Sequence, residues 1–160
     1  LVGSEMCIRD SAKIMSLQEP GKKMSKSDTN ANATILLLDD TDTIIRKFKR
    51  AVTDSESEVR YAEEKPGISN LMDIYSAVTG KTYEEIEKEF AGKGYGDFKL
   101  AVGETVADHL KPLQERYEQL MKDKAYIESM IKQNDEKAAY YANKTLRKVQ
   151  KKVGLTERIR

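Results

Sequence analysis

From about residue 44 onward, apolar residues recur three and four positions apart, and this spacing constrains the fold most strongly. A repeat of three to four places apolar side chains on one face of an α-helix. Proline, glycine and a capping box of Thr82 with Glu85 divide the pattern into separate helices. Strands and helices do not alternate as they do in a doubly wound sheet. We therefore expect a mainly α fold, a helical bundle.

Composition sets further bounds on a chain of 160 residues with a net charge of +1. The length allows one domain with a modest core, and any attraction to nucleic acid must come from local patches. One cysteine and one histidine exclude an internal disulfide and a Cys/His zinc cage. The longest apolar run, residues 35–38, is too short to cross a membrane. We expect a cytoplasmic protein with no membrane partner.

Residues 23–27 read Lys-Met-Ser-Lys-Ser and follow Pro20, Gly21 and Lys22. We call residues 23–27 the lysine loop. Its two ammonium groups and two hydroxyls form a set that polyphosphate chemistry uses, since both kinds of group stabilise growing negative charge. The glycine upstream suits a segment that closes over a ligand and opens again. On composition alone, a plain solvated loop remains the alternative.

The same pentapeptide is the second signature of class I aminoacyl-tRNA synthetases. Five flanking blocks resemble the bacterial-type tryptophanyl-tRNA synthetases in the same order, and the resemblance runs from about Ala12 to the C-terminus. The blocks are residues 13–17, 37–40, 51–55, 65–71 and 92–96. The resemblance implies ATP-dependent activation of tryptophan and its transfer to tRNA(Trp).

The resemblance also implies roles for single residues. Lys26, assisted by Lys23, is expected to be catalytic by neutralising the departing pyrophosphate, and Met24 is expected to pack the closed loop. ATP would be a substrate that brings its own Mg²⁺, and we expect no metal site in the chain itself. The expected ATP-binding residues are Ile14, Lys23, Met24, Ser25, Lys26 and Ser27.

The expected domain organisation has three parts. Residues 1–11 resemble nothing in the family and are interpreted as a non-native leader. Residues 12–30 would end the catalytic, nucleotide-binding domain and carry the lysine loop, and residues 31–160 would form a helical C-terminal domain that binds the tRNA anticodon.

The first class I signature is missing, because the chain contains no Ile-Gly dipeptide. The tryptophan pocket, most of the ATP site and the usual dimer surface are therefore expected upstream of this sequence. We interpret the chain as the C-terminal fragment of an enzyme that is a homodimer at full length. Alone, the fragment is expected to be inactive.

The last 24 residues, 137–160, carry eight lysines and arginines against one glutamate. Within a helix predicted to start at Asn134 or Asp135, four basic residues share one face, and an apolar stripe from Ala138 to Val153 is predicted to be buried. This face is a candidate for tRNA phosphates, although a merely soluble helix exterior remains the alternative. The four residues are Lys144, Arg147, Lys148 and Lys151.

Two expectations concern the helix after residue 40. Ile44, Ile45, Phe48 and Val52 should form its buried stripe. The basic residues beside them, Lys47 among them, should face solvent.

Three rival functions stay open at this point. The first is a class I synthetase for tyrosine or methionine, which the loop alone does not exclude. The second is a non-catalytic helical RNA-binding module, and the third is a structural helical domain without a ligand.

Overall fold

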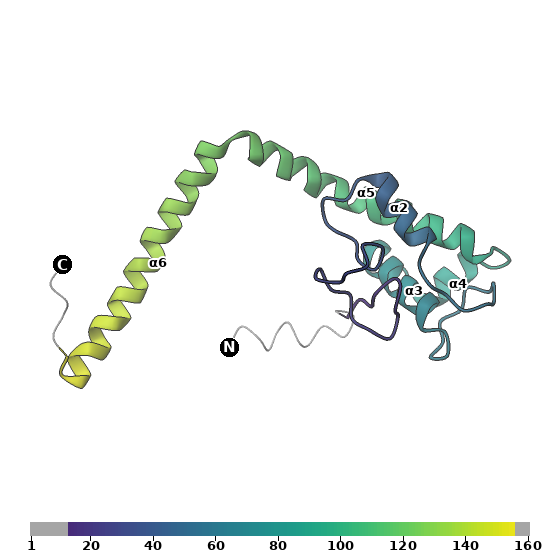
Figure 1. Cartoon of the computed structure of the whole chain (residues 1–160), viewed down its shortest axis with the longest axis horizontal. Coiled ribbons are helices and arrows are strands. Elements are labelled where there is room, and N and C mark those ends of the chain that lie inside the picture. The colour runs from purple at the N-terminus through teal and green to yellow at the C-terminus, as the bar shows by residue number, and fades with distance from the viewer. Residues whose placement is uncertain (1–12, 156–160) are drawn as a thin grey trace. The chain divides into compact units, whose positions relative to one another are not determined.

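The computed structural model describes residues 13–155 as a helical protein, shown in Figure 1. The helices are α2 (Thr41–Lys49), α3 (Pro66–Thr79), α4 (Tyr83–Glu89), α5 (Tyr95–Lys122) and α6 (Lys124–Val153). Within that range there is no strand, only one isolated bridge between Met15 and Lys23. The mainly α prediction is confirmed. The predicted leader, residues 1–11, lies outside the described residues.

The chain divides into two units, one ending at Gln114 and the other starting at Glu115. In the first unit, α2, α3, α4 and the first part of α5 gather with the loops between them (Figure 1). One hydrophobic core unites them and includes Leu17 from the segment before the lysine loop. Rings of Tyr75, Phe90 and Phe98 meet edge to face in that core, with centroids 4.8 to 5.8 Å apart. The segment just before the lysine loop is therefore packed on the helices.

Helix α2 begins after Asp40, whose side chain accepts a hydrogen bond from the Thr43 amide at 2.8 Å. Ile44 and Phe48 are buried as predicted. Two expectations are wrong. Val52 is 45% exposed because the helix has ended before it, and Lys47 is only 5% exposed. The Lys47 ammonium lies 2.5 Å from Asp39 Oδ2 and donates to Thr34 O at 2.9 Å, so burial is compensated by a charge partner.

The C-terminal end of α3 and the N-terminal end of α4 lie where the sequence predicts them. Gly80 follows α3 in the left-handed conformation, with φ of 75°, which glycine adopts without steric cost. The capping box of Thr82 and Glu85 opens α4 and is present in both directions. At the other end of α3, Pro66 occupies the first turn, where its missing N–H costs nothing.

The connector between α2 and α3 is more buried than its polar sequence suggests. Lys65 is 2% exposed, forms an ion pair with Glu56 and donates to Tyr95 Oη at 3.3 Å. Tyr95 Oη in turn donates to Asp54 Oδ1 at 2.8 Å. Gly67 lies so close to the connector that an added Cβ would stand 2.3 Å from Val52 O. Only glycine fits at that position.

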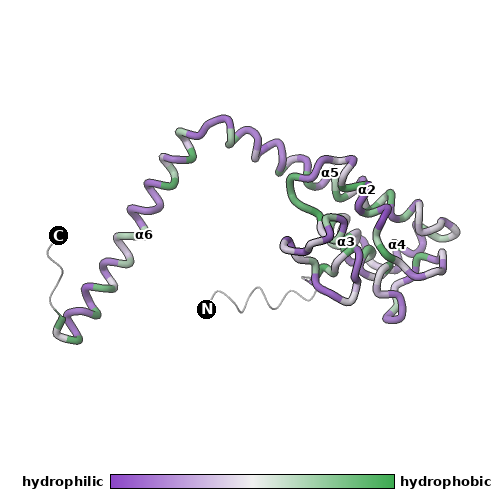
Figure 2. The backbone as a smooth tube through the Cα atoms, in the orientation of Figure 1, coloured by the Kyte–Doolittle hydropathy of each residue, from purple (hydrophilic) through white to green (hydrophobic). Residues whose placement is uncertain are grey.

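Helix α6 differs from its prediction in two respects. It runs unbroken through Asn134 and Asp135, where a helix start was predicted, because exposed polar side chains are tolerated inside a helix when water solvates them. The apolar stripe is also not buried, since no described residue of α6 is buried and Tyr141 is 66% exposed. Figure 2 shows the hydrophobic positions of α6 as short green segments in a mostly purple helix.

No helix in residues 13–155 combines the length and the apolar character that crossing a membrane requires.

Candidate functional site

The lysine loop grows out of a short hairpin. Ser16 N donates to Lys22 O at 2.8 Å, and Met24 N donates to Ile14 O at 3.0 Å. These two bonds flank the bridge between Met15 and Lys23, as in an antiparallel pair. The turn at Pro20 and Gly21 connects the two arms. The loop base is therefore fixed by main-chain pairing.

The loop separates its charged side chains from its apolar one. Met24 is half-buried and packs against the core, whereas Lys23, Ser25, Lys26 and Ser27 are exposed. The hydroxyls of Ser25 and Ser27 lie 2.9 Å apart and share a hydrogen bond. The structure thus presents two ammonium groups and two hydroxyls to solvent on a segment that one apolar anchor holds down.

A second set of contacts holds the middle of the loop. Thr34 Oγ1 donates to Ser25 O at 2.7 Å, and Thr34 O accepts from the buried Lys47 ammonium at 2.9 Å. Lys47 is paired with Asp39, so the loop is tied to α2 through a chain of polar contacts. Sequence reasoning missed Thr34, Lys47 and Asp39. The sequence does show a lysine, Lys47, on the helix after the candidate phosphate loop, but its side chain was expected to face solvent.

The electrostatics of the loop base are local. A hydrogen bond and the charge of Glu19 raise the pKa of Lys22, which keeps that ammonium protonated. Lys22 is thereby engaged by Glu19 within its own turn. Lys23 and Lys26 are exposed as well, so both side chains are open to an incoming anion.

The basic residues predicted on the last helix are exposed. Arg147, Lys148 and Lys151 line one shallow hollow of about 400 Å³ together with Leu155. The Lys144 ammonium lies 5.8 Å from the ring centroid of Tyr140, a favourable cation–π distance. The structure therefore brings three of the four residues to one hollow and places the fourth beside an exposed aromatic ring.

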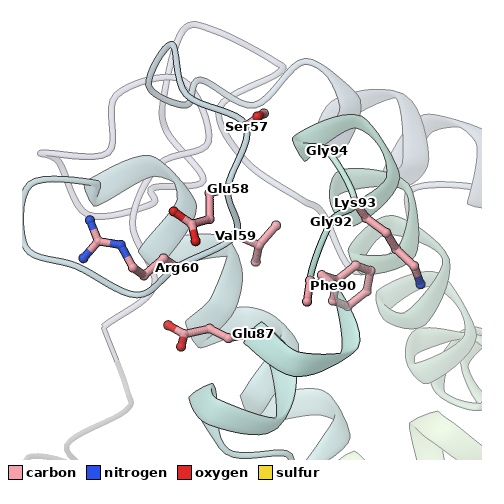
Figure 3. A pocket seen from close by; sticks show the side chains of 10 residues that line it. Ser57, Glu58, Val59, Arg60, Glu87, Phe90, Gly92, Lys93 and Gly94 are labelled. Carbon is pink, nitrogen blue, oxygen red and sulfur yellow. The ribbon is translucent and has the colours of Figure 1, made fainter.

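Another cavity, of about 410 Å³, opens between the connector and the end of α4 (Figure 3). The side chains of Val59 and Phe90 supply its apolar part, and Glu58, Glu87 and Arg60 add charges of both signs. None of the predicted site residues lines it. The full lining is Ser57, Glu58, Val59, Arg60, Glu87, Phe90, Ala91, Gly92, Lys93 and Gly94. Its mixed charge favours no single class of ion.

Comparison with known proteins gives a consistent result. The family model described as tRNA synthetases class I (W and Y) matches residues 5–111. The tryptophan–tRNA ligase of Clostridium tetani is 50% identical over 143 residues, which are 89% of this chain and 42% of that protein. The tryptophan–tRNA ligase of Clostridium perfringens is 49% identical over 150 residues, or 94% of this chain and 45% of that protein.

Solved structures agree with the sequence relatives. The crystal structure of tryptophanyl-tRNA synthetase from Mycoplasma pneumoniae matches with a TM-score of 0.74 and 29% identity, over 91% of this chain and 46% of that one. The enzyme from Campylobacter jejuni, at 24% identity and a TM-score of 0.67, shares the fold. The chain thus spans less than half the length of the relatives it matches.

Proposed function

Because this chain belongs to the class I tRNA synthetase family of the W and Y type, we propose that it forms the C-terminal part of a tryptophan–tRNA ligase. The relatives named above support tryptophan as the amino acid. The complete enzyme would activate tryptophan with ATP and transfer it to tRNA(Trp). It would do so in the cytoplasm and as a homodimer.

In the proposed reaction, the carboxylate of tryptophan attacks the α-phosphorus of ATP, and pyrophosphate leaves. Negative charge grows on the departing oxygens, and Lys26 neutralises it with the help of Lys23. Ser25 and Ser27 donate hydrogen bonds to the same oxygens. No general base is needed, because the attacking carboxylate is already ionised.

The observation that carries this proposal is that the lysine loop packs its apolar side chain and exposes its polar ones. Met24 is held against the core, while both lysines and both serines face solvent. Ile14, which is proposed to meet the adenine through its backbone, accepts the hydrogen bond of the Met24 amide at 3.0 Å. The adenine contact and the phosphate contacts would therefore lie on one hairpin.

Mg²⁺ would enter with ATP, as the counterion of its phosphates. In residues 13–155 there is no cluster of three or more His, Cys, Asp or Glu side chains that could hold a metal ion.

The proposal is tested by changing Lys26 to Ala in a full-length enzyme that carries this segment. The rate of single-turnover adenylation should fall about 100- to 1000-fold, while the affinity for tryptophan stays unchanged, because the lysine acts where charge develops. Lys26→Arg should also be slow, since a planar guanidinium does not replace a compact ammonium. Equal adenylation rates for the wild type and Lys26→Ala would rule out the assignment.

A pyrophosphate-exchange assay of the full-length enzyme separates the two amino acids that the family covers. Pyrophosphate exchange that depends on tyrosine, and not on tryptophan, would show that the rival amino acid is the substrate.

A further inference from the structure

Asn70, in the first half of α3, reaches a segment of backbone that is 55 positions away in the sequence. Its side chain is 3% exposed. Asn70 Oδ1 accepts from Met15 N at 2.8 Å, and Asn70 Nδ2 donates to Met15 O at 3.0 Å. The carboxamide thus offers one acceptor and one donor, as the backbone of a neighbouring strand would.

The residues on either side of Met15 form their backbone hydrogen bonds with the arm of the hairpin that leads into the lysine loop. Successive residues of an extended segment direct their backbone polar groups to opposite sides. Met15 is bonded to Asn70, while Ile14 O and Ser16 N are bonded to Met24 N and Lys22 O. Asn70 therefore holds the segment on which the base of the loop is paired.

The end of this segment is held by other groups. Leu17 N donates to Ala33 O at 3.0 Å, and Leu17 O accepts from Val52 N at 2.8 Å. The hydroxyl of Ser16, which is buried, accepts from the amides of Gln18 and Glu19 at the start of the turn. These contacts lie at Ser16 and beyond, so Met15 depends on the bonds from Asn70.

We infer that Asn70 is a positioning residue for the lysine loop, and that it acts through the main chain of Met15. This inference rests on the proposed function. Loss of the carboxamide leaves the N–H and C=O of Met15 without these partners, and the hairpin can then shift. A displacement of about 1 Å can reduce a reaction rate about 100-fold when a catalytic group must meet growing charge.

The chain contains a matched control at the next position. Ser69 is also buried, and its hydroxyl donates to Ala62 O at 2.8 Å and accepts from Ala62 N at 3.1 Å. Like Asn70, Ser69 thus makes two hydrogen bonds from α3 to the backbone of one residue outside the helix. It holds the connector, however, and not the hairpin. Ser69→Ala should therefore lower stability without moving the loop.

The first experiment compares Asn70→Ala, Asn70→Asp and Ser69→Ala in the full-length enzyme. In Asn70→Ala, kcat for tryptophan-dependent pyrophosphate exchange should fall about 10- to 100-fold, with KM for tryptophan unchanged. Asn70→Asp keeps the shape and the acceptor but, when ionised, loses the donor, so it should show the same loss even if Asn70→Ala does not fold. Ser69→Ala should keep the wild-type kcat.

The second experiment measures amide hydrogen exchange in this 160-residue chain, so that it does not depend on activity. The Met24 amide, which is bonded to Ile14 O, should exchange about tenfold faster in the Asn70 variants and at the wild-type rate in Ser69→Ala. An unchanged kcat in both Asn70 variants would overturn the inference, and so would equal acceleration of Met24 exchange in Ser69→Ala. If the wild-type enzyme shows no tryptophan-dependent pyrophosphate exchange, the proposed function is wrong. The hydrogen-exchange rate of the Met24 amide then tests by itself whether Asn70 positions the loop.

Discussion

Single polar side chains fasten distant backbone segments throughout the first unit. Lys99 of α5 donates to Ala51 O at 2.8 Å and to Thr53 Oγ1 at 2.9 Å, and burial lowers the pKa of this ammonium. Asn70 and Ser69 do the same for Met15 and Ala62. The connector and the hairpin contain no regular helix or strand, so these bonds replace the ladder that would otherwise hold them.

Asp54 gives a pH-dependent test of one such contact. Burial acts to raise the pKa of Asp54, but hydrogen bonds from Tyr95 and from backbone amides outweigh it, and the pKa lies below its ordinary value. A lowered pKa means that the carboxylate stabilises the fold at pH values above the unfolded pKa of about 3.9. This contribution is lost as the pH falls through the lower, folded pKa.

We therefore expect Asp54→Asn to lower the free energy of unfolding at about pH 7, by at most about 1 kcal/mol because the group is partly exposed. The difference from wild type should shrink at about pH 3, which lies below the unfolded pKa of about 3.9, because the unfolded wild-type chain binds a proton there. Urea unfolding at both pH values measures it, with Asp108→Asn, an exposed aspartate of α5, as the control. A difference that is the same at both pH values would show that the charge of Asp54 does not contribute.

At the scale of the helices, local signals decide where each element starts and stops. Asp40 and Thr82 begin α2 and α4, and Gly80 ends α3, each through contacts with a residue three or four positions away. The length of α6 is the exception, because Asn134 and Asp135 carry the same type of signal without breaking the helix. A possible cap takes effect only when the surrounding sequence also favours leaving the helix.

The basic face of α6 leads to a prediction at this scale. Changing Lys148 and Lys151 together to Ala should weaken tRNA binding, because two cations that contact phosphates are lost. The slope of log affinity against log salt should become flatter by roughly 0.7–0.9 for each contact that is removed. Adenylation should stay at the wild-type rate, since the lysine loop is untouched.

The control for this experiment is the pair Lys124→Ala with Lys132→Ala, two exposed lysines of α6 that lie away from this face. It removes the same charge and should leave the salt slope nearly unchanged. If both double variants reduce affinity equally, the helix contributes only its net charge. If neither does, the anticodon contacts lie elsewhere.

At the scale of the whole molecule, the chain holds the lysine loop and lacks the first class I signature. We expect the purified chain alone to show no tryptophan-dependent pyrophosphate exchange, because it contains no Ile-Gly dipeptide and the tryptophan pocket is proposed to lie upstream of it. Addition of the separately produced N-terminal half of the Clostridium tetani enzyme should restore some exchange, since 50% identity favours a matching surface. Exchange by the chain alone would contradict the proposal that the catalytic site needs residues beyond it.

The sequence by itself determined the helical class, the C-terminal end of α3, the start of α4, and the family. Helix periodicity and caps depend on residues within a few positions of one another, and the Lys-Met-Ser-Lys-Ser loop with its flanking blocks is read directly from the chain. Met24 is half-buried against the core, while its packing in the closed loop and the catalytic and tRNA-binding roles stay predictions.

Only the tertiary structure decided that Lys47 and Lys65 are buried, that the stripe of α6 is exposed, and that Asn70 holds Met15. A lysine has the same sequence signal whether it faces water or a buried carboxylate, and its burial depends on the partner that the fold brings to it. The Asn70 contact joins positions 55 residues apart. Such a contact exists only after the core has placed α3 beside the hairpin, because no local pattern in the sequence encodes that distance.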